Sequence, residues 1–189
     1  MEKQRQRKKK KEPPSPIRWA AIVFFMAVII SAGMGLASEL LLSGAGLLLA
    51  AGVLLLFILL GILFDIVGVA VTAADPRPLN SMASHKERGA KEALRLVRNA
   101  NRVSSVCNDV VGDICGIVSG VTGAVIASRL RAAFGLESLL VSVGLTALIS
   151  GLTIGGKALG KTFAIRRGTD VTYWAGHFLY LFRPRRKRR

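Results

Sequence analysis

The sequence predicts an all-α, polytopic membrane protein with about four transmembrane helices and further amphipathic helices on the cytoplasmic surface. Its 189 residues are 51% hydrophobic, yet the formal net charge is +16. A membrane protein reconciles these values by keeping its charges outside the spans. Four apolar blocks match or approach the roughly 20 residues needed to cross the hydrocarbon core. They are Trp19–Leu36, Gly46–Ala74, Val103–Ala127 and Leu136–Ile154.

Basic residues are distributed unevenly among the connections between these blocks. Lys and Arg number eight in residues 1–18, seven in residues 75–102 and ten from Lys157 onward, and the link after the first block has none. By the positive-inside rule, this alternation predicts a multi-pass protein of the cell membrane with both termini in the cytoplasm. The first block also has features of a cleaved signal peptide, but its length favours a retained span.

Both ends of the chain are basic tails. Residues 1–17 are rich in lysine and break at prolines, which predicts a disordered segment, and residues 183–189 form a second tail after a stretch of aromatic residues. Cations at this density attract anionic lipid headgroups. We therefore expect the lipid bilayer and its anionic headgroups as partners. No nucleic-acid partner is expected, because the spans hold the basic segments against a membrane.

The second apolar block is longer than one span requires. We expect it to be tilted, bent near Gly61 or Gly68, or partly outside the membrane. Pro76 and Pro78 cannot continue a helix, so the block ends before them.

A basic amphipathic helix is predicted after this break. Ser84 and Glu87 have the spacing of a capping box, which opens a helix that runs to about Val97. Its apolar residues fall near one face: Ala90, Ala93, Leu94 and Val97. The remainder is strongly basic, with Lys86, Arg88, Lys91, Arg95 and Arg98. This pattern indicates a helix that lies on the membrane surface.

The third block carries polar side chains that a lipid-facing span would not. Asn108, Asp109 and Asp113 lie in its first half. A carboxylate at membrane depth costs about 3 kcal/mol on insertion scales, so such groups usually face a protein interior or a watery path. Asp65 and Thr72 of the second block offer polar groups that meet them. We therefore expect all five side chains to face an ion.

Carboxylates, an amide and hydroxyls are oxygen ligands that suit Mg²⁺ or Ca²⁺. Asn108, Asp109 and Asp113 are accordingly the candidate metal ligands. In the alternative interpretation Asp109 and Asp113 form salt bridges with Arg98 or Arg102, and Asp65 is protonated or paired with Lys157. No nucleophile–base pair, phosphate loop or hydrolytic metal motif is present, so we expect neither an enzyme nor a resident cofactor.

Small residues also mark the third block. Gly112, Gly116 and Gly120 lie four residues apart and form a stripe that predicts close packing against another helix. Cys107 and Cys115 are eight residues apart on the same helix. That spacing separates them by about 12 Å, too far for a disulfide, so we interpret them as small packing residues.

Three phrases in series carry a family resemblance. They are LFDIVGVAVTAAD at 63–75, AKEALRLVRNANRVSSVCNDVVGDI at 90–114, and GKALGKTFAIRRGTD at 156–170 followed by WAGHFLYLF. From about Leu60 onward the chain thereby resembles the transmembrane domain of the CNNM/CorC (CorB) family of magnesium transport proteins. The resemblance implies a helical membrane domain at residues 60–182, preceded by an extra membrane region at residues 18–59. It also implies a homodimer, an ion site among the spans and Mg²⁺ as the transported ion.

The resemblance places Asn108 at the family's polar ligand and Thr72 at a small polar position. Two family carboxylates are replaced, because Gly68 and Lys157 stand where the family pattern has glutamate. The family's cytoplasmic CBS pair is not expected either, since the chain ends soon after the third phrase.

Two functions remain open at this point. The first is a component of divalent-cation transport, with Asp65, Asn108, Asp109 and Asp113 facing the ion. The second is a non-transporting scaffold or regulatory relative, in which Lys157 occupies a vacated metal position and pairs with an aspartate. A lipid-binding protein built around the basic termini ranks last.

Overall fold

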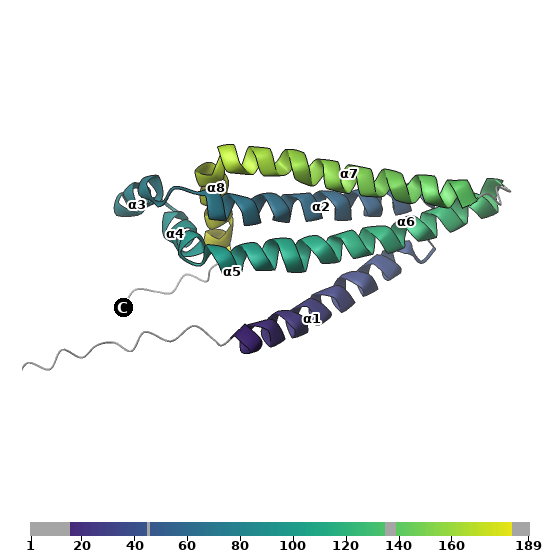
Figure 1. Cartoon of the computed structure of the whole chain (residues 1–189), viewed down its shortest axis with the longest axis horizontal. Helices are drawn as coiled ribbons and strands as arrows, with labels where there is room; N and C mark the ends of the chain where they lie inside the picture. The colour runs from purple at the N-terminus through teal and green to yellow at the C-terminus, as the bar shows by residue number, and fades with distance from the viewer. Residues whose placement is uncertain (1–15, 45, 135–138, 183–189) are drawn as a thin grey trace, which may run out of the picture.

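A computed structural model describes residues 16–44, 46–134 and 139–182, and within these ranges the chain forms an elongated bundle of helices without strands (Figure 1). The long helices are α1 (Pro16–Leu42), α2 (Leu47–Ala73), α6 (Asp113–Phe134) and α7 (Leu139–Arg166). The shorter elements are α3 (Pro76–Ser84), α4 (Ala90–Arg98), α5 (Ala100–Ser105), the π-helix η1 (Val106–Gly112) and α8 (Gly168–Leu181). Residues 16 and 17 of the expected N-terminal tail belong to α1, and the rest of the two expected tails, residues 1–15 and 183–189, lies outside the described residues.

The four predicted spans are confirmed. Four helical stretches are long and apolar enough to cross a membrane: Ile17–Leu42, Leu47–Ala73, Ala100–Ala133 and Leu140–Arg166. The third is composite, because α5, η1 and α6 follow one another without a break. The fourth extends well past the expected end at Ile154. Glycine at 155 and 156 weakens a helix but does not terminate it, and the lysines that follow find carboxylate partners on neighbouring helices.

Helix α2 is the central element of the bundle. Figure 1 shows it between α6 and α7. It is one continuous helix of 27 residues, with no break at Gly61 or Gly68. These glycines instead admit close neighbours, because a Cβ at Gly61 would lie 3.0 Å from Cβ of Cys115. On another side of α2, Ile62 and Ile66 fill the space above Gly156 and Gly160 of α7.

The connection after α2 differs from the expected capping box. The prolines end α2 as predicted, but Pro76 then begins α3, where Asp75 caps the helix by accepting a hydrogen bond from the Arg77 amide at 2.9 Å. The Ser84 hydroxyl donates to the carbonyl of Asn80 at 3.0 Å and caps nothing. The predicted helix start at Ser84 is therefore wrong.

Helix α4 starts instead after Gly89, which has a φ of 84°. Its apolar face is confirmed, since Ala90, Ala93 and Leu94 are buried. This face packs on α8, where a Cβ at Gly176 would lie 2.5 Å from the Ala93 amide nitrogen. Helix α8 runs across the bundle at the end where α3 and α4 lie (Figure 1).

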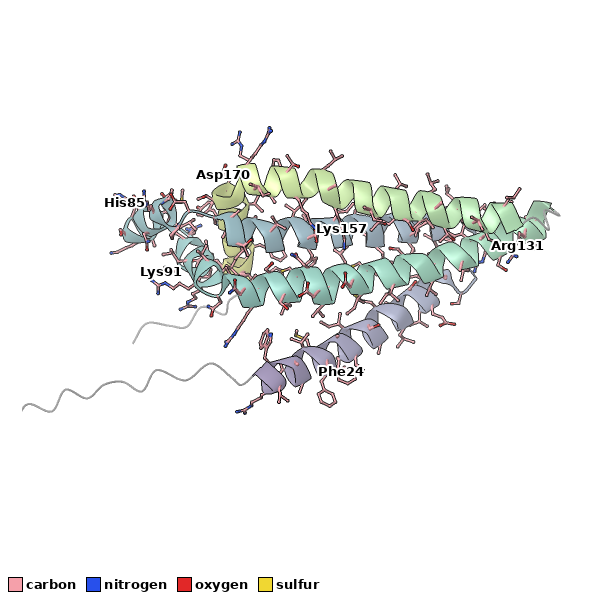
Figure 2. All side chains as sticks on the ribbon, viewed as in Figure 1. Phe24, His85, Lys91, Arg131, Lys157 and Asp170 are labelled. Carbon is pink, nitrogen blue, oxygen red and sulfur yellow. The ribbon has the colours of Figure 1, made fainter. Side chains whose placement is uncertain are left out.

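Basic and aromatic side chains concentrate at this end of the molecule, where His85, Lys91 and Asp170 lie in Figure 2. Trp174 and Phe178 of α8 are 69% and 60% exposed, as expected for rings at the headgroup level. Helix α1 is the least attached span. Its Trp19 lies under the Arg102 guanidinium at 5.3 Å, and Ser38 hydrogen bonds Thr122 of α6 at 3.2 Å.

Gly89 should be essential for the α4–α8 contact. An alanine there would adopt a left-handed φ and bring its Cβ to 2.5 Å from Cα of His177. We expect Gly89→Ala to lower the unfolding free energy by about 1–3 kcal/mol, measured as a lower thermal midpoint in detergent. Gly52→Ala is the matched control, because nothing lies within 4 Å of its Cβ position. An unchanged midpoint for Gly89→Ala would contradict this contact.

Candidate ion site between α2, η1 and α7

The candidate site forms where η1 packs against α2. Within its seven residues, η1 widens the helical turn, and such π segments occur frequently at functional sites. Cys107, Val110 and Gly112 of η1 are buried. A Cβ at Gly68 of α2 would lie 3.1 Å from Cβ of Cys107, so the two backbones approach closely.

Asn108 is oriented in this contact by a hydrogen bond from its amide nitrogen. Its Nδ2 donates to the Ser104 hydroxyl at 3.2 Å, which leaves Oδ1 turned toward α2. Oδ1 is buried and accepts no hydrogen bond. A Cβ at Gly68 would overlap this oxygen. The absence of a side chain at Gly68 therefore makes the room that the Asn108 side chain fills.

Asp65 lies one turn before Gly68 on α2 and is only 4% exposed. Its Oδ2 accepts no hydrogen bond, and Nζ of Lys161 on α7 lies 4.0 Å away. The sequence interpretation had placed Lys157 beside Asp65, whereas the cation beside it is Lys161. A buried carboxylate oxygen without a donor is costly, so this group is stabilised by the nearby ammonium or by a bound cation.

Lys157 lies one turn earlier on α7 and reaches α6. Its Nζ is 4.0 Å from Oδ1 of Asp113, and its side chain is 22% exposed while that of Asp113 is 68% exposed. The same Nζ would lie 3.6 Å from a Cβ at Gly112. Figure 2 shows Lys157 near the middle of the bundle. Asp113 therefore contacts a lysine of α7 rather than Arg98 or Arg102.

The remaining sequence candidates lie apart from this contact. Asp109 is exposed, and Thr72 is also exposed and donates its hydroxyl to the carbonyl of Val69 at 2.7 Å. The five expected ion-facing side chains thus do not converge on one point. In the described part of the chain, no three His, Cys, Asp or Glu side chains gather as metal ligands. Among these candidates, the buried oxygens without a hydrogen bond are Oδ2 of Asp65 and Oδ1 of Asn108.

The small-residue stripe has two different environments. Gly112 is buried against α2 and Lys157, whereas nothing lies within 4 Å of a Cβ at Gly116 or Gly120. Gly116 and Gly120 line a cavity of about 210 Å³ between α6 and α7, together with Thr146, Ile149, Ser150, Thr153 and Ile154. Cys107 and Cys115 are buried and free, as predicted.

The arrangement defines a multi-pass membrane protein with charged groups held between its spans. A family model for the cyclin M transmembrane N-terminal domain matches residues 52–183, and the chain belongs to this CNNM family. The match begins at Gly52 within α2 and includes every later helix, while α1 lies outside the matched residues. No curated protein and no solved structure matches the chain.

The contact between Gly68 and Asn108 can be tested with a double-mutant cycle. We expect Gly68→Ala alone to lower the unfolding free energy by about 1–3 kcal/mol, because the new Cβ overlaps Oδ1 of Asn108. In an Asn108→Ala background the same substitution should cost much less, since the overlapping atoms are gone. Thermal unfolding of the four proteins gives the coupling energy. Additive effects would show that Asn108 does not occupy this space.

Proposed function

We propose that this protein binds a divalent cation between α2 and η1 and mediates its passage across the cell membrane. Because the chain belongs to the CNNM family, we expect this cation to be Mg²⁺. The observation that carries the proposal is the pair of buried oxygens without donors, Oδ2 of Asp65 and Oδ1 of Asn108, on adjacent helices. Mg²⁺ prefers oxygen ligands and keeps several of its waters, so a few protein ligands suffice. Mg²⁺ is the substrate here and not a resident cofactor.

The two lysines determine how this site would work. Two like unit charges 4 Å apart repel by about 4 kcal/mol near a protein surface, and a divalent ion doubles the repulsion. Mg²⁺ beside Asp65 therefore requires the ammonium of Lys161 to move away. Its side chain is 53% exposed, so it has room to do so. The lysine and the ion compete for one carboxylate.

A second function is favoured by the position of Lys157. Its ammonium stands where the family pattern has glutamate, and it lies 4.0 Å from Asp113. If Lys157 and Lys161 remain paired with their aspartates, they take the place of the metal, and the protein acts as a non-transporting scaffold or regulatory subunit. No catalytic role is part of either function.

Mg²⁺ flux into proteoliposomes that contain an entrapped Mg²⁺-sensitive dye tests both functions. For a transporter, Asp65→Asn should reduce the flux about tenfold, because one charge-assisted contact is lost. Lys161→Gln should increase apparent Mg²⁺ affinity by removing the competing ammonium. Asp109→Asn is the matched control, since this carboxylate is exposed and lies outside the contact.

The outcomes of this assay separate the two functions. Wild-type flux that Asp65→Asn and Asn108→Ala leave unchanged would contradict the transport site. Absence of wild-type flux, together with Mg²⁺ binding that appears only in Lys157→Glu, would support the non-transporting function. If Lys157→Glu gains no binding, the vacated-metal interpretation of Lys157 is wrong.

We also propose that the protein works as a homodimer through the side of the bundle where Gly116 and Gly120 line the open cavity between α6 and α7, with α3, α4 and α8 on the cytoplasmic side. Small residues allow close helix contact in a membrane, and these two have no neighbour within 4 Å of their Cβ positions. Gly116→Leu should therefore reduce the dimer fraction in native mass spectrometry, whereas Gly52→Leu on α2 should not. A monomeric wild type would contradict the dimer.

A further inference from the structure

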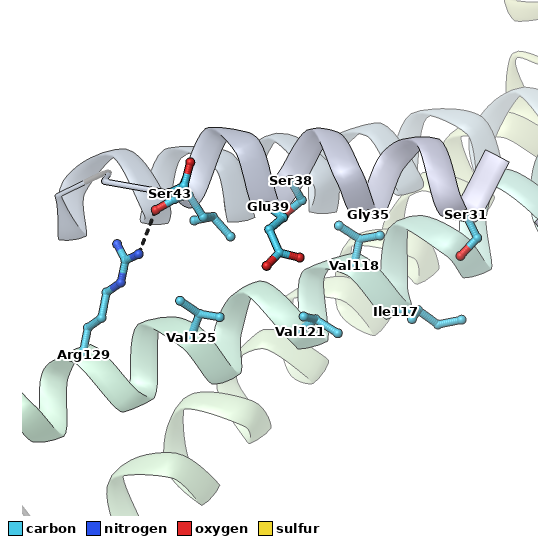
Figure 3. A pocket seen from close by; sticks show the side chains of 11 residues that line it. Ser31, Gly35, Ser38, Glu39, Ser43, Ile117, Val118, Val121, Val125 and Arg129 are labelled. Atoms are coloured by element: carbon cyan, nitrogen blue, oxygen red, sulfur yellow. Dashed lines mark hydrogen bonds between the residues drawn. The ribbon is translucent and has the colours of Figure 1, made fainter. Parts of the chain in front are cut away.

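A groove between α1 and α6 lies away from the candidate ion site. It encloses about 450 Å³, within the range of small-molecule pockets. Figure 3 shows its two walls. One wall is apolar and comes from α6, with Ile117, Val118, Val121 and Val125. The other wall comes from α1 and the turn after it, and most of its residues are small or polar: Ser31, Gly35, Ser38, Glu39, Leu42 and Ser43.

Two hydrogen bonds between α1 and α6 fix the geometry of this groove. The Ser38 hydroxyl hydrogen bonds Thr122 at 3.2 Å, and both residues are buried. At the end of α1, the Arg129 guanidinium donates to the carbonyl of Leu42 at 2.8 Å. These contacts tie α1 to α6 beside the groove. Ile117 and Val121 nevertheless remain 62% and 61% exposed, so the apolar wall is accessible from the surrounding lipid.

Glu39 is the single acidic residue of α1. Its side chain points into the groove toward α6 in Figure 3. Among the described residues no hydrogen bond or ion pair involves its carboxylate. Glu39 lies one turn before the end of α1, at the end of the bundle opposite α3, α4 and α8 (Figure 1). Glu39 is exposed, so a cation or hydrogen-bond donors from outside the chain can reach its carboxylate.

We propose that this groove binds one phospholipid with a primary-amine headgroup, of the phosphatidylethanolamine type. The ammonium of the lipid donates hydrogen bonds to the Glu39 carboxylate, and its phosphate lies toward the Arg129 guanidinium at the mouth of the groove. An acyl chain follows the apolar wall past Val121 toward Ile117. From Ser43 to Ser31 the groove spans twelve residues of helix, or about 18 Å, which accommodates a large part of an acyl chain.

The charges at the mouth select this headgroup over the other common ones. A carboxylate and a guanidinium at one end complement a headgroup that carries both an ammonium and a phosphate. A trimethylammonium group has no N–H donor for Glu39, whereas a primary ammonium has three. A purely anionic headgroup would bring a second negative charge to the carboxylate. Charge-assisted hydrogen bonds are about twice as strong as neutral ones, so the ammonium should dominate the selection.

Native mass spectrometry of the whole chain tests the proposal. The protein is exposed in detergent to an equimolar mixture of phosphatidylethanolamine and phosphatidylcholine with identical acyl chains, and in a second sample to phosphatidylethanolamine and phosphatidylglycerol. Wild type should retain the primary-amine lipid about tenfold more often, and Glu39→Gln should bring the ratio close to one. Glu87→Gln, on the connection before α4, is the matched control and should keep the wild-type ratio.

A second pair of variants tests the groove independently of its charge. Gly35 lines the groove, and nothing lies within 4 Å of its Cβ position, so Gly35→Leu should fill the space without disturbing the packing. This variant should lose the bound lipid. Gly33→Leu should retain it, because Gly33 also has no neighbour within 4 Å and does not line the groove. Equal retention of both lipids by wild type, preferential retention of phosphatidylglycerol, or an unchanged ratio in Glu39→Gln would overturn the proposal.

Discussion

The close contact of η1 with α2 is the constraint on which the arrangement of the other helices depends. No water is present in a bilayer core to solvate polar groups, so the protein itself must satisfy them. Gly61, Gly68 and Gly112 remove side chains at this contact and let the backbones approach. Once α2 and η1 are joined in this way, α7 packs on another side of α2 and brings Lys157 and Lys161 within reach of the two aspartates.

Much of the fold could be predicted from the sequence, because length and hydropathy dominate the formation of spans. The end of α7 could not, since Lys157 and Lys161 look like residues that leave the membrane until their carboxylate partners are known. The start of α3 was missed for a local reason. Asp75 followed by Pro76 is a stronger helix start than the spacing of Ser84 and Glu87, which lies in the connection after α3.

The candidate site was predicted in part. A polar residue inside a span is visible in the sequence, and Asp65 and Asn108 are both at least partly buried next to the contact. Asp109 and Asp113 are also polar residues inside a span, but they are exposed. Which face of a helix is covered depends on the neighbouring helices, and no local sequence pattern encodes their positions. Lys161 was missed altogether. Lys161 could have been identified from its position four residues after Lys157, because this spacing puts both amines on one face of α7.

The hydrogen bond between Ser38 and Thr122 joins residues 84 positions apart and has a consequence for biosynthesis. The ribosome makes α1 long before its partner α6, and none of the most apolar 18-residue window of α1 is buried by the rest of the chain. During translation α1 must therefore remain in the bilayer with only α2 beside it until α6 is made. This window has a mean hydropathy of 2.4, and the only charged residues of α1 are Arg18 and Glu39. The helix is therefore apolar enough to stay in the bilayer during this interval.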